Sequence, residues 1–179
     1  MFRVSISSSA IAVLCTIVMV LGLGLQQSRA WGQRESDLRP MPPLLRTVSD
    51  EIGVLSNDEG LTLAKKLADI RAVTGAKVII LIAETTQPES IEAYVRRLVL
   101  HWGNQEFKLA DGRYVFVVLA RRDHALRIVA GEHYKDTITQ LSARGLVAGA
   151  LSHLQAGRYY EALDMVIKQL ADLLGGIVI

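Results

Sequence analysis

One stretch decides the fold: residues 111–131 read DGRYVFVVLARRDHALRIVAG. Every residue from Tyr114 to Ala120 is apolar, and most are β-branched or aromatic, which is typical of a strand covered on both faces. A second apolar run from Ala125 to Ala130 contains one charge, Arg127. The four polar residues between the two runs, Arg121 to His124, are enough for a short turn. The stretch therefore predicts a central β-hairpin.

The sequence before the hairpin alternates between helix and strand. Ser56 and Glu59 have the spacing of a capping box and open a helix from about Asn57 to Thr74, which Gly75 ends. Lys77 to Ala83 is a short, β-branched run that predicts a strand buried on both faces. The segment from Leu44 to Val48, ending at Asp50, predicts a short first strand.

A second helix follows Pro88, because apolar residues recur at helical spacing from Ile91 to Trp102 and Gly103 ends the pattern. A strand, a helix and a strand in this order predict a right-handed crossover and parallel strands. After Gly131 the pattern is helical, with Gly157 separating two segments. The predicted fold class is α/β: a small mixed β-sheet with a central hairpin, sandwiched between helices (αβα).

Residues 1–30 have the features of an export signal. Arg3 is the only early charge, residues 10–25 are apolar, and small residues precede Trp31 at the positions that a signal peptidase reads. Cleavage after Ala30 would release the protein into the periplasm or cell envelope. The alternative is an uncleaved N-terminal anchor, which would tether the protein to the membrane through residues 10–25. The apolar run is shorter than a comfortable span of ~20 residues, which favours cleavage.

The rest of the chain divides into three parts. Residues 31–47 contain Pro40 and the pair Pro42-Pro43, and we expect an extended tether there. Residues 48–174 form the single α/β domain. Residues 175–179 are an apolar tail, which we expect to pack on the domain, for example along a sheet edge, or to contact a partner.

Charge and cysteine content exclude several classes of function. Two of the 20 basic residues and none of the 18 acidic residues lie in the leader, so the remaining chain carries 18 of each. This neutrality argues against nucleic acid as a partner. The only cysteine is Cys15 in the leader, so the domain has no disulfide and no thiolate for catalysis or metal binding.

Carboxylates at strand ends are the candidate site. Asp50, Glu84 and Asp123 each follow a predicted strand, and ligands of parallel sheets gather beyond the carboxyl ends of the strands. If the strands are parallel, the three side chains converge and suit calcium or magnesium, which could then polarise a phosphate. Asp111 lies at the other end of its strand. The alternative, which we favour, is that these aspartates are turn residues.

Several short motifs, in this order, resemble the TPM domain family: Val48-Ser49-Asp50, Gly53-Val54-Leu55-Ser56, Thr74-Gly75-Ala76-Lys77-Val78, Ser90-Ile91-Glu92-Ala93-Tyr94, Trp102, Asp111-Gly112, Arg121-Arg122-Asp123 and Ala156-Gly157-Arg158-Tyr159-Tyr160. The resemblance extends from about Val48 to Leu174. It implies an exported or membrane-tethered α/β sandwich. Members of the family are found in bacterial envelopes, in thylakoid proteins that serve photosystem repair, and in receptor accessory proteins. Some are acid phosphatases, and some bind calcium.

The sequence departs from the family at two places that bear on catalysis. The position after Asp111 lacks the family's asparagine, and the segment that usually reads Gly-x-Gly-x-Glu is Gly131-Glu132-His133-Tyr134-Lys135 here. We therefore expect a non-catalytic accessory or assembly/repair factor for a membrane protein complex. The alternative is a calcium- or magnesium-dependent acid phosphatase that uses Asp50 with Asp123 or Asp111.

Overall fold

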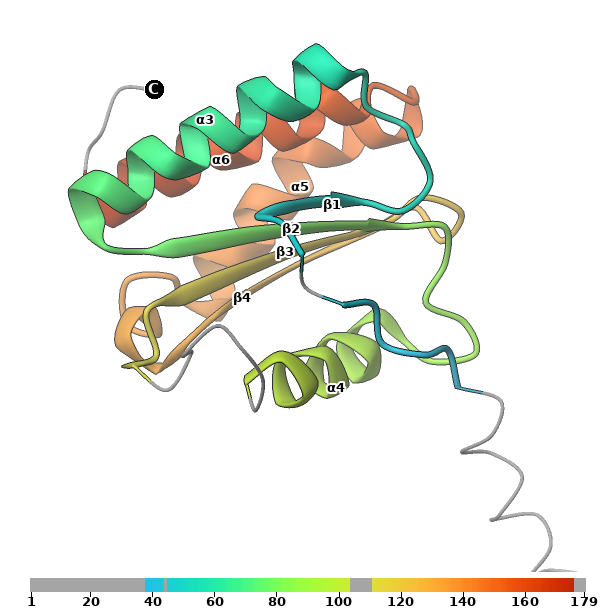
Figure 1. Cartoon of the computed structure of the whole chain (residues 1–179), viewed down its shortest axis with the longest axis horizontal. Coiled ribbons are helices and arrows are strands. Elements are labelled where there is room, and N and C mark those ends of the chain that lie inside the picture. Colours follow the sequence, from blue (N-terminus) through green and yellow to red (C-terminus); the bar gives the residue numbers. More distant parts are fainter. Residues whose placement is uncertain (1–37, 44, 104–110, 176–179) are drawn as a thin grey trace, which may run out of the picture. The chain divides into compact units, whose positions relative to one another are not determined.

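A four-stranded mixed sheet forms the centre of the fold (Figure 1). The computed structural model describes residues 38–43, 45–103 and 111–175. The strands lie in the order β1 (Val48–Asp50), β2 (Lys77–Ala83), β3 (Tyr114–Ala120) and β4 (Ala125–Ala130). β1, β2 and β3 are parallel, and β3 pairs antiparallel with β4. The predicted hairpin and the predicted parallel crossover are both confirmed.

The burial of each strand follows its composition. In β2 and β3, six of the seven residues are buried, because these two inner strands are covered on both faces. In β4 only Leu126 and Ile128 are buried and the other four residues are half-buried, since the strand lies at the edge of the sheet. The single charge in its sequence, Arg127, is therefore carried by a strand with one open edge.

Three helices cover one face of the sheet: α3 (Asn57–Thr74), α5 (Gln140–Gln155) and α6 (Tyr159–Gly175) (Figure 1). Their apolar side chains form the larger core with alternate residues of the strands, such as Val117 and Ile128. The capping box of α3 is present, because Ser56 accepts from the amide of Glu59 and the Glu59 carboxylate accepts from the amide of Ser56. Gly75 ends the helix in the left-handed conformation.

The opposite face is covered by α4 (Ile91–Gly103), which completes the αβα sandwich (Figure 1). The helix begins three residues after Pro88, and its residues Tyr94, Leu98 and Trp102 pack on Phe116 and other side chains of the sheet. A short 3-10 helix, η2 (Glu132–Tyr134), connects β4 to α5. No helix in the described ranges is both long and apolar enough to cross a membrane.

The end of the predicted tether contacts the domain. The indole N–H of the buried Trp102 donates to the carbonyl oxygen of Pro42 at 2.7 Å, and Met41 packs beside the same cluster. This part of the proline segment is thus held on α4. The leader, residues 31–37 of the tether and residues 176–179 of the tail lie outside the described residues.

Candidate functional site at the carboxyl edge of the sheet

The parallel strands bring three of the four predicted acidic residues to the same edge of the sheet. Asp50 ends β1, Glu84 follows β2, and Asp123 lies in the turn between β3 and β4. Two backbone bonds hold this edge together beyond the strands: the Arg121 amide donates to the Ala83 carbonyl at 3.0 Å, and the Arg122 amide donates to the Glu84 carbonyl at 2.7 Å. These bonds join the loop that follows β2 to the turn that follows β3.

Asp50 organises the loop between β1 and α3. Its Oδ1 accepts from the amides of Ile52 at 3.1 Å and Gly53 at 2.9 Å, and its Oδ2 accepts from the amide of Leu55 at 2.9 Å. Gly53 has a φ of 66°, the left-handed conformation that this tight turn requires. Three amide hydrogens thus point at the carboxylate. The structure of this loop agrees with the turn-residue interpretation.

Glu84 forms an ion pair with Arg121 across the two neighbouring loops. Nη2 of Arg121 lies 2.8 Å from Oε1 and 2.7 Å from Oε2 of Glu84. The hydrogen bond to Glu84 raises the pKa of Arg121. The side chains of Glu84 and Arg121 are 35% and 42% exposed, so water screens the pair and it contributes little to stability. Its main effect is to neutralise the carboxylate at this edge.

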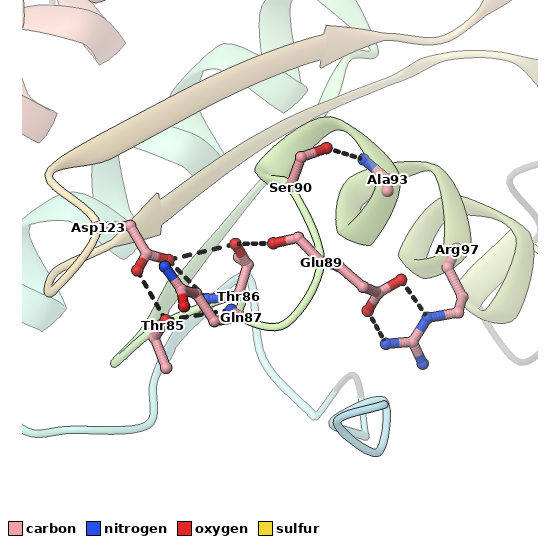
Figure 2. Close-up of polar contacts among 8 residues, drawn as sticks. All are labelled: Thr85, Thr86, Gln87, Glu89, Ser90, Ala93, Arg97 and Asp123. Atoms are coloured by element: carbon pink, nitrogen blue, oxygen red, sulfur yellow. Dashed lines mark hydrogen bonds and ion pairs between the residues drawn. The ribbon is translucent and has the colours of Figure 1, made fainter. Parts of the chain in front are cut away.

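Asp123 joins the β3–β4 turn to the loop between β2 and α4 (Figure 2). Its Oδ1 accepts from the Thr85 hydroxyl at 2.7 Å, and its Oδ2 accepts from the Thr86 amide at 2.7 Å and lies 3.2 Å from the Thr86 hydroxyl. Burial alone would raise the pKa of Asp123, but the hydrogen bonds from Thr86 and Thr85 outweigh it and lower the pKa. The carboxylate is held ionised between two loops rather than capping its own turn.

The same loop continues into the first turn of α4. The Thr86 hydroxyl is also 3.2 Å from the Glu89 carbonyl oxygen (Figure 2). The Glu89 carboxylate accepts two hydrogen bonds from the guanidinium of Arg97 (Figure 2). Thr85 and Thr86, which come directly after Glu84 at the end of a buried strand, were not among the predicted site residues. That position beside Glu84 was the signal that could have identified them.

Asp111 lies at the opposite edge of the sheet, before β3. Its Oδ1 accepts from the Arg113 amide at 3.0 Å, and its Oδ2 lies 3.5 Å from Nζ of Lys77. The amide hydrogen bond, with the smaller attraction of Lys77, lowers the pKa of Asp111. Asp111 is thus a turn residue separated from the other three acids by the length of β3.

A close backbone crossing explains the glycine beside Asp111. Gly112 has a φ of 66°, and its carbonyl accepts from the amide of His133 at 3.2 Å. A Cβ on Gly131 would lie 2.3 Å from the carbonyl oxygen of Gly112, so only glycine fits there. This crossing needs one glycine from each segment.

These contacts limit the chemistry of the edge. In the described part of the chain, no three acidic or histidine side chains are placed to hold one metal ion together. The carboxylates of Asp50 and Asp123 each receive several N–H or O–H donors, and Glu84 is paired with a guanidinium. As a single set of ligands, the acids do not fit calcium or magnesium in this arrangement.

The fold is similar to three domains solved by NMR in solution. The N-terminal domain of a protein from P. gingivalis matches with a TM-score of 0.65 and 19% identity, over 72% of this chain and 82% of that chain. The N-terminal domain of cg2496 from Corynebacterium glutamicum matches with a TM-score of 0.59 and 12% identity, over 77% of this chain and 87% of that chain. BA42 from the psychrophilic bacterium Bizionia argentinensis matches with a TM-score of 0.56 and 13% identity, over 70% of this chain and 84% of that chain. At these identities the similarity shows a shared fold.

Comparison with curated protein sequences finds no significant match. The sequence model of the TPM domain, in contrast, matches residues 48–173, which is more than half of the chain. The matched range includes every strand and every helix described above, except the last two residues of α6. The chain therefore belongs to the TPM domain family.

Proposed function

We propose that this protein is an exported, non-catalytic TPM domain that acts as an accessory or assembly/repair factor for a membrane protein complex of the cell envelope. The observation that carries the proposal is the use of the acidic side chains. Asp50 accepts from backbone amides of its own loop. Asp123 accepts from Thr85 and Thr86 in the loop between β2 and α4, and Glu84 is paired with Arg121. Carboxylates engaged in this way maintain the shape of a surface.

The leader and the tether support the location. An apolar run at residues 10–25 directs the chain to export, and the proline segment after it connects to the domain near α4. A domain held at the membrane surface, or released beside it, is well placed to contact membrane proteins. Whether the leader is cleaved changes the mode of attachment and not the proposed role.

Capture from the envelope tests the proposal. The full chain, carrying an affinity tag and expressed in its own host, is crosslinked before the membranes are solubilised in detergent. We expect a defined set of integral membrane proteins to co-purify with the chain, and to do so equally with Asp50→Asn. An unrelated exported α/β domain with the same tag is the control. Recovery of the same membrane proteins with the control domain would contradict the proposal.

A metal-dependent phosphatase is the second candidate, because Asp50, Glu84 and Asp123 do share one edge of the sheet. A site there would have to replace the contacts described above, and metal binding by Asp50, Glu84, Asp123 and Asp111 stays a prediction. Metal bound to the folded state alone would stabilise it by about 2.7 kcal/mol at a hundredfold excess over Kd. We expect millimolar calcium or magnesium to leave the melting temperature unchanged.

A further inference from the structure

The open edge of β4 offers a place for a further strand. β4 is six residues long and ends the sheet, whereas β1 at the other edge has only three residues. The Gly131 amide donates to the Tyr114 carbonyl at 2.8 Å, and the register pairs Val129 with Phe116 and Arg127 with Val118. In an antiparallel ladder every second residue bonds its partner, so the N–H and C=O groups of Leu126, Ile128 and Ala130 point away from β3.

These outward groups border a groove of about 710 Å³ between β4 and α5. Among the described residues, no hydrogen bond is made by the amides of Leu126, Ile128 or Ala130. Apolar side chains of α5, including Val147 and the 39% exposed Leu151, line the far side of the groove. The groove therefore combines free backbone groups with an apolar wall, which is the arrangement that binds an extended peptide by strand addition.

The charge of the groove selects the kind of peptide. Three of its four charged lining residues are basic, Arg127, Lys135 and Arg144, and the fourth is Glu92. Arg127 is only weakly paired, with Nη1 at 3.9 Å from Oε1 of Glu92. Its Nε is buried and has no hydrogen-bond partner in the described part of the chain. The Arg127 side chain is 30% exposed, so its guanidinium is accessible to a carboxylate brought by a ligand, which would form a charge-assisted hydrogen bond.

A second copy of this chain fits the groove less well. Pairing of two β4 strands around a two-fold axis would bring the Arg127 side chains of both copies to the same face of one joined sheet, and like charges on neighbouring strands repel. A charge on an edge strand also protects against aggregation. Protection against aggregation needs only the charge of Arg127. It does not account for the unpaired Nε of Arg127 or for the apolar side chains of α5 that line the groove.

We propose that the edge of β4 binds an extended, acidic segment of a partner protein by β-strand addition. Leu126 and Ile128 face the core beneath α5, and Arg127 and Val129 face the side of α4. An added strand would therefore carry apolar residues toward Val147 and acidic residues toward Arg127, in alternation. The inference deepens the proposed function, on which it rests, because it names the kind of segment that the accessory domain would hold.

Peptide selection tests this inference with a defined probe. Random dodecapeptides displayed on phage are selected on the immobilised full chain, and enriched sequences are synthesised as free peptides. We expect alternation of acidic and apolar residues in the selected peptides. Binding should weaken at least about tenfold in Arg127→Gln, which removes the charge. It should weaken similarly in Ala130→Pro, which removes an outward amide that β3 does not use.

Two controls separate binding from folding. Lys65→Gln removes one positive charge from the exposed surface of α3 and should leave the affinity unchanged. Amide hydrogen exchange of the unmodified chain should show protection of Leu126, Ile128 and Ala130 only after peptide is added, while Arg127 and Val129 are protected throughout. Each variant should melt at the same temperature as the unmodified protein, which shows that it is folded. If Ala130→Pro does not fold, Arg127→Gln and the exchange experiment test the inference without it.

Four results of the peptide selection, binding and exchange experiments would overturn the inference. They are the absence of enriched peptides, peptides without acidic residues, equal binding to Arg127→Gln and the unmodified chain, and protection that maps elsewhere. Concentration-dependent dimerisation lost in Ala130→Pro would assign the edge to a second copy. Protection in the free chain that disappears when residues 175–179 are deleted would assign it to the tail. Capture of the membrane complex by the β4 variants, without peptide binding, would leave the proposed function standing and overturn this inference alone.

Discussion

Asp123 shows how one carboxylate can hold two loops that are distant in sequence. It contacts Thr85 and Thr86, 38 and 37 residues away, and the amide of Thr86 is one of its closest donors at 2.7 Å. Asp50 instead holds a single loop, because its partners lie within five residues of its own position. Both side chains therefore stabilise the conformation of the carboxyl edge.

Loss of the Asp50 carboxylate should destabilise the protein. Asp50→Ala leaves the amides of Ile52, Gly53 and Leu55 without their acceptor. We therefore expect the free energy of unfolding to fall by about 1–3 kcal/mol. Asp50→Asn keeps one acceptor oxygen and should lose less. Urea denaturation measures both values. Asp69→Ala on the exposed surface of α3 is the control, and an equal effect of Asp69→Ala and Asp50→Ala would contradict the role given to Asp50.

The lowered pKa of Asp123 predicts a dependence of stability on pH. The unfolded chain has a pKa near the usual ~3.9, so the ionised carboxylate stabilises the folded state above that pH, and this contribution is lost as the pH falls through the lower pKa of the folded state. The free energy of unfolding should therefore decline more steeply below about pH 4 in the unmodified protein than in Asp123→Asn. Parallel curves for the two proteins would show that the contacts to Thr85 and Thr86 do not favour the charged form.

At the scale of elements, the crossing of β3 and η2 depends on a missing side chain. Gly131→Ala places a Cβ against the Gly112 carbonyl and the ring of Tyr114, and we expect destabilisation by about 1–3 kcal/mol. Gly145→Ala in α5 meets no neighbouring atom within 4 Å and should instead stabilise the helix by about 0.5–1 kcal/mol. Thermal unfolding of the two variants measures the difference, and equal effects would contradict this account of the crossing.

The proline segment should be bound to α4 through Trp102. Trp102→Phe removes the donor to the Pro42 carbonyl, and we expect a loss of about 1–3 kcal/mol in the free energy of unfolding. In a chain that lacks residues 1–43, the same substitution should cost less, because the partner is already gone. A double-mutant cycle of the two changes measures the coupling. Strict additivity would mean that the segment does not contribute to stability through this bond.

At the scale of the whole molecule, the αβα architecture could be predicted because its signals are local. The capping box at Ser56, Gly75 and the apolar runs of β2 and β3 define their elements without reference to distant residues. The sequence also placed Asp50, Glu84 and Asp123 at one edge, since parallel strands require it. Their partners could not be predicted, because the contact of Asp123 with Thr86 depends on the paths of two loops.

The leader gives a prediction that concerns the whole chain. In an exporting host, the mature protein should begin at Trp31 and occur in the soluble envelope fraction, because the apolar run of residues 10–25 precedes a small-residue cleavage site. Mass measurement of the N-terminal peptide tests this. A protein that retains Arg3 and sediments with membranes would show that the run is an anchor.

The central claim is that the carboxylates at the edge of the sheet serve structure and not hydrolysis. Hydrolysis of p-nitrophenyl phosphate by the purified protein at acidic and neutral pH, with and without calcium or magnesium, tests it most directly, beside Asp50→Asn and the control Asp69→Asn. We predict no turnover above the buffer rate for any of the three proteins under any of these conditions. Metal-dependent turnover by the unmodified protein and Asp69→Asn that is lost in a folded Asp50→Asn would contradict the claim and establish the phosphatase alternative.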